Sequence, residues 1–340
     1  MKKIGLTFLM LCASMLTGCV QTSYNGFRSS NVDMSVREIS VKNNDNVLQM
    51  LDEARSAVVG ISVSVSGGYT AIGSGVAISS GGYILTNNHV IEDGKDIKLY
   101  YADKTTGLAS VLWNDPAVDM AILKSSREIP YLSTEDLNNT FVGEDVYAIG
   151  TPLTLEFKHT VTKGIVSAMD RTLESKSDNG TIYLQSLVQH DASINPGNSG
   201  GPLITSEGKV IGLNTLKASE GEGIAFAVPI KLGKIIVLKL KENKDYKTPY
   251  MGVFAFDSDL AEIYNQNFYS DGVYVYSTTG PAKQAGLKKG DIITYINDKK
   301  ISNMLDFRAE IYEKDIDDII SVTFERDGVF QKVDLKLTKR

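Results

Sequence analysis

From about residue 46 to residue 229 the sequence is a series of short apolar runs, and this rhythm restricts the fold more than any other feature. Each run ends at Gly, Asn or Asp, as in GSGVAIS, GYILT, MAILK, DVYAIG and GIAFAV. Closely spaced β-forming runs of this kind are typical of an all-β barrel or sandwich. Apolar residues at helical spacing are expected only from residue 229, in PIKLGKIIVLKLK, where one face carries Leu232, Ile235, Ile236 and Leu240.

The 340 residues leave room for two or three domains. The segment ENKDYKTPY at 242–250 is charged and contains proline, which indicates a domain boundary. Beyond it, expected strands surround one expected helix near NMLDFRAEIYEKD. We therefore predict a mainly β domain at 46–242 followed by a small α+β domain at 248–340. The net charge of −6 argues against a nucleic-acid partner.

The first residues have the features of a targeting segment. MKKIGLTFLMLCASMLTGC begins with two lysines, continues as a short apolar run and ends in small residues before Cys19, as a secretory signal peptide does. The ending LTGC resembles a bacterial lipobox, which predicts a signal peptide at 1–18, a lipid on Cys19 and a polar tether at 19–45. The alternative is an ordinary signal peptide with an incidental cysteine. The only other cysteine is Cys12, so the mature chain would have no disulfide.

The stretch NPGNSGGPL at 195–203 places Ser199 among glycines and prolines, which excludes a helix or a central strand. GNSGG matches the G-x-S-x-G elbow of α/β-hydrolases, in which the histidine follows the serine. Here His89, His159 and His190 all precede Ser199. The order His, Asp, Ser is instead that of chymotrypsin-like double barrels. The alternative is a turn that contains an incidental serine.

Among the three histidines, His89 has the best context for a general base. It follows the strand GYILT where the chain turns polar, a position typical of catalytic groups on a rigid scaffold. Asp119 interrupts the apolar run NDPAVDMAILK, and a buried carboxylate there needs a partner such as a histidine N–H. His190 and Asp191 remain the rival base and acid, and Asp119 could instead bind local backbone N–H groups.

The glycines beside Ser199 suit the stabilisation of an oxyanion. Backbone N–H donors that point at a developing oxyanion stabilise it by about 3–4 kcal/mol each. Gly197 can adopt the backbone angles that direct its own N–H and that of Ser199 to one point. Side chains at Gly200 or Gly201 would crowd the approach to that point.

Several blocks of the chain resemble the HtrA/Deg family of serine proteases. TNNHV, DPAVDMAIL and QHDASINPGNSGGPL look like the three catalytic blocks of that family, in order and at family-like spacing. GSGVAIS and GLNTL are similar to further family segments. In the C-terminal part, GPAKQAGLKKGDIITYIND at 280–298 resembles a PDZ domain, and the resemblance as a whole extends from about residue 50 to residue 340.

The resemblance implies a chymotrypsin-like double β-barrel, an ATP-independent endopeptidase that needs no cofactor or metal, and usually a homotrimer. It makes His89 the general base, Asp119 its orienting acid and Ser199 the nucleophile. The oxyanion hole would consist of the N–H groups of Gly197 and Ser199.

The resemblance also assigns a specificity pocket, formed by Ile194 with Leu213 and Thr215 of the GLNTL strand. None of these side chains is acidic, so small or medium aliphatic residues are expected before the scissile bond. Arg171 matches a regulatory loop arginine of the family, and the alternative is a solvated surface residue. The loop TPLTLEFKHT at 151–160 departs from the Gly-rich family form, which makes regulation less certain than catalysis.

The segment YMGV is similar to the carboxylate-binding loop of PDZ domains, formed here by Tyr250, Met251, Gly252 and Val253. Such a domain would bind an extended C-terminus along GVFAF. The function expected is a lipid-anchored protease of the bacterial cell envelope, facing the periplasm or the exterior, that degrades or processes misfolded or regulatory proteins. A chaperone or adaptor with secondary proteolysis, or an esterase, are the alternatives.

Overall fold

The computed structural model describes residues 36, 38–39, 47–65, 70–92, 94–151, 159–177, 180–217, 223–263 and 271–339. The predicted signal peptide, the predicted lipidation site Cys19, most of the predicted tether and residues 152–158 of the departing loop lie outside this range. Within it, no helix is long and apolar enough to cross a membrane.

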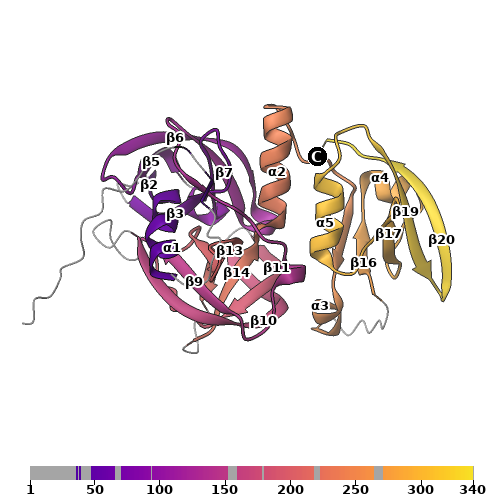
Figure 1. Ribbon diagram of the computed structural model, residues 1–340. Coiled ribbons are helices and arrows are strands. Elements are labelled where there is room, and N and C mark those ends of the chain that lie inside the picture. Colours follow the sequence, from indigo (N-terminus) through magenta and orange to yellow (C-terminus); the bar gives the residue numbers. More distant parts are fainter. Residues whose placement is uncertain are drawn as a thin grey trace, which may run out of the picture. The chain divides into compact units, whose positions relative to one another are not determined.

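Two closed antiparallel barrels make up the first domain (Figure 1). The first joins its strands in the order β2-β3-β4-β7-β6-β5, with bounds Val58–Val65, Thr70–Ala77, Tyr83–Thr86, Met120–Ser125, Thr106–Asp115 and Gly94–Tyr100. The second has the order β10-β11-β14-β13-β12-β9, with bounds Thr160–Ser177, Gly180–His190, Ala225–Pro229, Val210–Lys217, Pro202–Thr205 and Asp145–Gly150. The predicted double β-barrel is confirmed.

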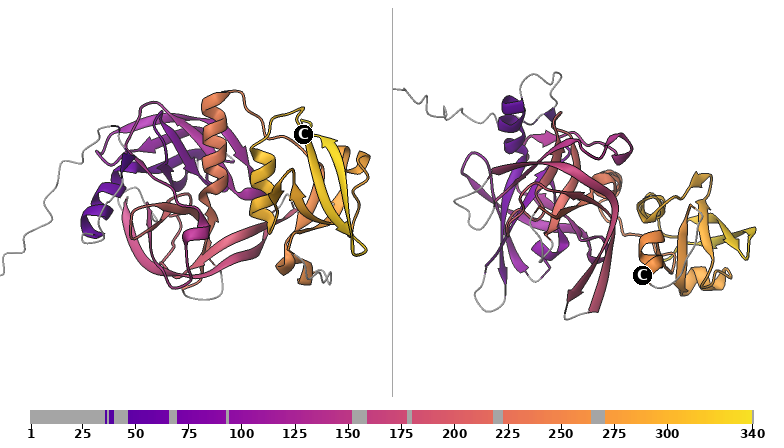
Figure 2. Two further views of the ribbon diagram at one scale, coloured as in Figure 1. Left: turned by 45° about the vertical axis from the view of Figure 1, so that its right-hand side comes forward. Right: turned by 90° about the horizontal axis from the view of Figure 1, so that it is seen from below.

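Strands β10 and β11 form a long hairpin in the second barrel (Figure 2). Their register shifts at three places between Val166 and Leu173, so the hairpin is bent by bulges rather than regular. Asp170 and Ser186 both adopt positive φ within it, at 55° and 59°. The bends turn individual side chains out of the regular alternation of a strand.

Before the barrels lies a helix that the apolar pattern did not predict. Helix α1, Val47–Ala54, buries Met50 and Ala54, which are one turn apart. The expectation that helical segments are missing before residue 229 was therefore wrong, because eight residues are too few for a clear period. A two-residue strand β1, Glu38–Ile39, pairs in parallel with β8, Tyr131–Leu132, so the predicted tether includes a paired segment.

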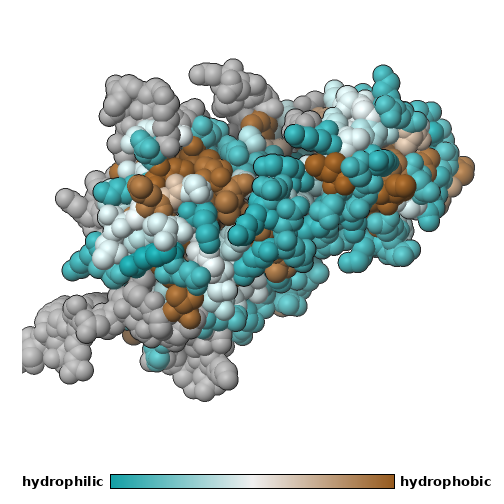
Figure 3. Space-filling model, turned by 90° about the horizontal axis from the view of Figure 1, so that it is seen from above, coloured by the Kyte–Doolittle hydropathy of each residue, from teal (hydrophilic) through white to brown (hydrophobic). Residues whose placement is uncertain are grey.

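Helix α2, Ile230–Glu242, follows β14 directly and has the predicted apolar face. The four side chains predicted for that face are buried, at 2%, 8%, 0% and 1% exposure for Leu232, Ile235, Ile236 and Leu240. Leu238 on the other side is 53% exposed. On the face that Figure 3 shows, the hydrophobic side chains gather in separate patches between hydrophilic ones.

The C-terminal domain is one antiparallel sheet with helices, as predicted. The sheet has the order β15-β16-β17-β19-β20, with bounds Val253–Phe256, Val273–Thr278, Ile292–Ile296, Ile319–Arg326 and Val329–Lys336, and β18, Lys299–Lys300, pairs with β17. The helices are α3 Ser258–Ile263, α4 Gly280–Gln284 and α5 Met304–Tyr312. Strand β15 is an edge strand, so one of its sides has backbone groups free to pair with another chain.

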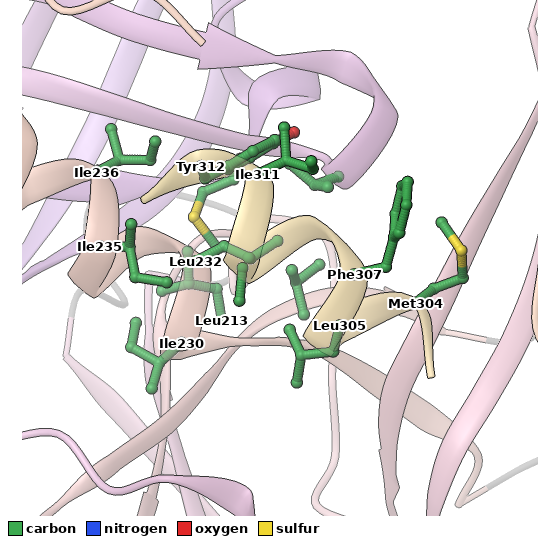
Figure 4. Packing of buried hydrophobic residues seen from close by; sticks show 14 of the residues in the cluster. Leu213, Ile230, Leu232, Ile235, Ile236, Met304, Leu305, Phe307, Ile311 and Tyr312 are labelled. Atoms are coloured by element: carbon green, nitrogen blue, oxygen red, sulfur yellow. The ribbon is translucent and has the colours of Figure 1, made fainter. Parts of the chain in front are cut away.

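Helices α2 and α5 pack against each other in a shared apolar cluster (Figure 4). The cluster includes Ile230, Leu232, Ile235 and Ile236 from α2, Leu213 from β13, and Met304, Leu305, Phe307, Ile311 and Tyr312 from α5. Burial of these side chains removes apolar surface from water on both helices and is the main source of stability at this contact.

Polar contacts reinforce the packing of α5. Arg308 donates from Nη1 to the carbonyl of Ala117 at 2.8 Å, and the Tyr312 hydroxyl donates to the Asp115 carboxylate. The Trp113 indole N–H donates to Thr248 Oγ1 at 2.7 Å. In all three bonds the partner from the barrel domain, Trp113, Asp115 or Ala117, belongs to the end of β6 or to the turn that follows it.

Shortening a buried side chain of α2 should cost far more stability than shortening an exposed one. Leu232→Ala leaves a cavity between α2 and α5, so we expect a loss of about 2–5 kcal/mol in the free energy of unfolding. Leu238→Ala makes the same chemical change at an exposed site and should stay within about 0.5 kcal/mol. Urea unfolding of both variants measures this, and equal losses would contradict the described packing.

Candidate active site

Three loops of the two barrels carry the residues of the predicted triad. His89 lies in a 3₁₀ turn, Asn88–Val90, directly after β4. Asp119 follows another 3₁₀ turn, Pro116–Val118, and adopts a left-handed conformation with φ 47°. Ser199 lies in the loop between β11 and β12 of the second barrel.

Asp119 and His89 are joined by two kinds of hydrogen bond. The Nδ1 atom of His89 lies 2.9 Å from Oδ2 and 3.0 Å from Oδ1 of Asp119, and its backbone N–H donates to Oδ1 at 3.0 Å. Asp119 is 7% exposed, so its carboxylate is nearly removed from water. A carboxylate at Nδ1 places the proton there and leaves Nε2 as the acceptor, which is the tautomer a general base needs.

Thr215 and Asn87 complete the surroundings of Asp119. Thr215 donates from Oγ1 to Asp119 Oδ2 at 2.5 Å, and Asn87 donates from Nδ2 to the Asp119 carbonyl at 2.9 Å. Thr215 was predicted as part of a specificity pocket, whereas its side chain binds the carboxylate of Asp119. The sequence signal for this role is the polar pair Asn214 and Thr215 within the apolar residues Val210–Leu216 of β13.

The pKa of His89 lies above its ordinary value of 6.5. Burial lowers it and is the largest single influence, but the hydrogen bond and charge of Asp119, together with the charge of Glu92, outweigh burial. The imidazolium is thereby stabilised next to two carboxylates.

Ser199 Oγ donates to the carbonyl of Thr215 at 3.0 Å. Among the residues that the structure describes, no hydrogen bond joins Ser199 to His89. Hydrogen bonds between catalytic groups are often formed only when substrate is bound, so this geometry leaves Ser199 a candidate nucleophile.

The backbone around Ser199 is fixed by Ser74 of β3. Ser74 donates from its N–H to the Ser199 carbonyl at 2.8 Å, and from Oγ to the Gly197 carbonyl at 2.8 Å. Gly197 has φ 101°, which only glycine adopts readily. In the described part of the chain the N–H groups of Gly197 and Ser199 have no acceptor, so both remain available to a ligand.

Gly200 and Gly201 are required by packing, which is a different reason from the predicted one. A Cβ at Gly200 would lie 2.2 Å from the Ser74 carbonyl oxygen, and one at Gly201 would lie 2.1 Å from the Ile149 carbonyl oxygen. Side chains there would therefore separate the Ser199 loop from both barrels before they could crowd a substrate.

The other two histidines and Asp191 lie in different surroundings from His89. His159 Nε2 lies 2.9 Å from the Val58 carbonyl, and Asp191 accepts the Ile165 N–H through Oδ1 at 2.6 Å. His190 is fully buried, and burial lowers its pKa to about 4 despite the charge of Asp191. None of the three lies in the Asp119 hydrogen-bond network.

Two of the predicted pocket residues are buried among apolar side chains. Ile194 is 5% exposed and packs with Val188, Ala225 and Ala227 inside the second barrel. Leu213 is fully buried in the cluster that α2 and α5 share, and its assignment to the pocket stays a prediction (Figure 4). Arg171 is exposed on β10, where its Nε donates to Gln189 Oε1 of β11 at 3.3 Å.

The predicted carboxylate-binding loop precedes β15. Gly252 has φ 86°, and a Cβ there would lie 2.2 Å from the Thr279 carbonyl oxygen, so only glycine fits. The N–H groups of Met251 and Gly252 have no acceptor among the described residues, while their carbonyls accept from Ala282 and Thr279.

A groove of about 950 Å³ extends from this loop. Val253, Phe254 and Ala255 of β15 line one side of it, and Phe307 and Ile311 of α5 line another. It is therefore a groove with apolar side chains on these two sides, charged ones such as Arg308 and Lys339 elsewhere in its lining, and free backbone N–H groups at one end. Among the described residues, no group of three or more His, Cys, Asp or Glu side chains could hold a metal ion.

Comparison with known proteins gives a family match for each of the two domains. Residues 73–213 match the model of the trypsin-like peptidase domain, and residues 239–337 match that of the PDZ domain. The serine protease Do-like HtrB of Bacillus subtilis is 33% identical over 332 residues, which cover 88% of this chain and 72% of that protein. A probable periplasmic serine endoprotease, DegP-like, of Marinomonas is 34% identical, over 80% of this chain and 58% of that protein.

Solved structures show the same relationship. The HtrA-type protease AlgW with a tripeptide superposes with a TM-score of 0.66 at 28% identity, over 88% of this chain and 97% of that one. The serine endoprotease from Yersinia pestis gives a TM-score of 0.59 at 29% identity, over 88% of this chain and 99% of that one.

The titration of His89 should depend on Glu92. Glu92→Gln removes a charge that raises the pKa of His89, so His89 should lose its proton at a lower pH than in the unsubstituted protein. Histidine NMR titration measures this, and it should place His89 above 6.5 and His190 near 4. Asp327→Asn, at the turn between β19 and β20, removes an equal charge elsewhere and should leave His89 unchanged. An unchanged His89 titration in Glu92→Gln would contradict a contribution of the Glu92 charge to the pKa of His89.

Proposed function

Because the chain belongs to the HtrA/DegP family of serine proteases, we propose that His89, Asp119 and Ser199 carry out its peptide-bond cleavage. The hydrogen bonds from His89 and Thr215 to the buried Asp119 carboxylate are the observation that best supports this. They fix the imidazole with Nε2 free and give the charge of the carboxylate three donors.

The proposed reaction begins when the Ser199 hydroxyl turns from the Thr215 carbonyl to His89 Nε2. His89 takes the hydroxyl proton as Ser199 Oγ attacks the substrate carbonyl, and Asp119 stabilises the imidazolium that forms. The N–H groups of Gly197 and Ser199 stabilise the oxyanion. His89 then protonates the leaving amine, and a water molecule, activated in the same way, hydrolyses the acyl-enzyme.

The PDZ domain is proposed to bind protein C-termini. The terminal carboxylate would accept from the N–H groups of Met251, Gly252 and Val253, in the loop that Tyr250 opens, and the chain would add to the edge of β15. An apolar last side chain suits Phe307 and Ile311 in the groove.

The proposal also covers the oligomeric state, location and anchoring of the enzyme. The enzyme is proposed to act as a homotrimer in the bacterial cell envelope, anchored by a lipid on Cys19, on misfolded or regulatory proteins. The relative from Marinomonas is named periplasmic, which supports the envelope location. Arg171, through Gln189 of β11, is proposed to relay occupancy of the PDZ domain to the Ser199 loop.

Casein degradation tests the catalytic assignment. The soluble chain from residue 20 should degrade casein, and Ser199→Ala should reduce the rate by at least about a thousandfold because no nucleophile remains. Ser193→Ala, in the same loop region, is the control and should retain activity. Suppression of aggregation by both proteins without any cleavage would instead favour the chaperone function, and cleavage of esters alone would favour the esterase.

The pocket should select small or medium aliphatic residues before the scissile bond. Ile194 is apolar and buried beside the Ser199 loop. None of the predicted pocket residues is acidic, so none could pair with a cationic substrate side chain. A peptide library analysed by mass spectrometry should show cleavage after residues such as Val or Ala. Cleavage mainly after Lys or Arg would overturn the predicted specificity.

A further inference from the structure

We infer that Gln185, on β11 of the protease domain, limits how many residues of a peptide ligand can pair with β15 of the PDZ domain. The inference rests on the proposed binding of C-termini along β15 and adds a residue from outside the PDZ domain to that site. It concerns which ligands fit, and it does not depend on the catalytic assignment.

The side-chain amide of Gln185 occupies backbone groups at the far end of β15. Its Oε1 accepts from the Asp257 N–H at 3.2 Å, and its Nε2 donates to the Ala255 carbonyl at 3.5 Å. Gln185 is 8% exposed and lines the same groove as Met251, Gly252 and Val253. The groove therefore begins at the carboxylate-binding loop and meets an amide of the protease domain farther along β15.

The position of Gln185 is fixed by its neighbour. Ser186 adopts a positive φ of 59° and accepts the Leu305 N–H through Oγ at 3.2 Å. Leu305 belongs to the first turn of α5, the helix that lines the groove. Gln185 is thus held between the two walls of the groove rather than on a free loop.

The spacing of a strand shows which ligand residues Gln185 opposes. A ligand that pairs antiparallel, with its last residue opposite Val253, places its third residue from the end opposite Ala255 and its fifth opposite Asp257, because paired strands advance by about 3.3 Å per residue. Gln185 already bonds both Ala255 and Asp257. A three-residue ligand meets only the longer of these two bonds, whereas a longer ligand has to displace the amide or bend away from β15.

The ligand class that follows is a C-terminus extended over its last three residues and free to leave the sheet edge beyond them. Replacing Gln185 should remove the competition at Asp257 and Ala255. A net hydrogen bond contributes a factor of about two to ten in an equilibrium, so the gain should be of that size for longer ligands and smaller for a three-residue ligand, which meets only the bond to Ala255.

Calorimetric titration tests this with the chain from residue 20 carrying Ser199→Ala, so that no peptide is cut. Two peptides share the same three apolar C-terminal residues, and one extends them to seven residues. Gln185→Ala should raise the affinity for the seven-residue peptide about threefold to tenfold and change that for the tripeptide by less than about twofold. Gln185→Met keeps the volume of the side chain and should give the same result. Gln331→Ala, exposed on β20, should change neither.

Each other outcome has a distinct meaning. An equal change for both peptides, or no change for the longer one in either Gln185 variant, would overturn the inference. Binding of neither peptide by any variant would overturn the proposed PDZ site and Gln185 with it, while casein degradation by the Ser199-containing chain would still report separately on catalysis. Thermal unfolding of the variants shows whether a loss of binding reflects a loss of fold.

Discussion

The buried carboxylate of Asp119 is the group on which the rest of the site depends. A carboxylate that is 7% exposed is costly unless hydrogen bonds replace its water, and here the donors come from both barrels. His89 belongs to the first barrel and Thr215 to the second, so these hydrogen bonds form only when the two barrels are correctly joined. The same contact fixes the orientation of the His89 imidazole. The joining of the two barrels and the proposed catalysis therefore both depend on Asp119.

Much of this arrangement could be predicted from local sequence. The order of His89, Asp119 and Ser199 restricts the barrel topology, and the apolar spacing in α2 is regular enough to identify its buried face. Leu213 and Thr215 show where such prediction ends. Alternation along β13 places both on one face, but it does not say what that face meets. Leu213 meets α2 and α5 while Thr215 meets Asp119, and each contact is made to an element far away in the chain.

Strand β11 carries residues that serve both domains. Near its middle, Gln185 and Ser186 contact β15 and α5, and it ends at His190, nine residues before Ser199. The Arg171 side chain reaches the same strand at Gln189. A single bulged hairpin therefore spans the distance between the proposed peptide groove and the loop of Ser199. Ser186, whose φ is positive, is held in that conformation by its hydrogen bond from the Leu305 N–H of α5.

The anchoring of α5 has a consequence for how the two domains can be studied apart. Trp113, Asp115 and Ala117 lie within six residues of Asp119, and their partners Thr248, Tyr312 and Arg308 all lie beyond α2. A protein that ends before residue 248 would lose the peptide groove and, at the same time, these three supports of the turn that presents Asp119. The activity of such a protein would reflect both the lost groove and the lost contacts near Asp119, which have separate causes. Substitutions in the carboxylate-binding loop remove the first effect alone, and they define what the PDZ domain contributes as a receptor.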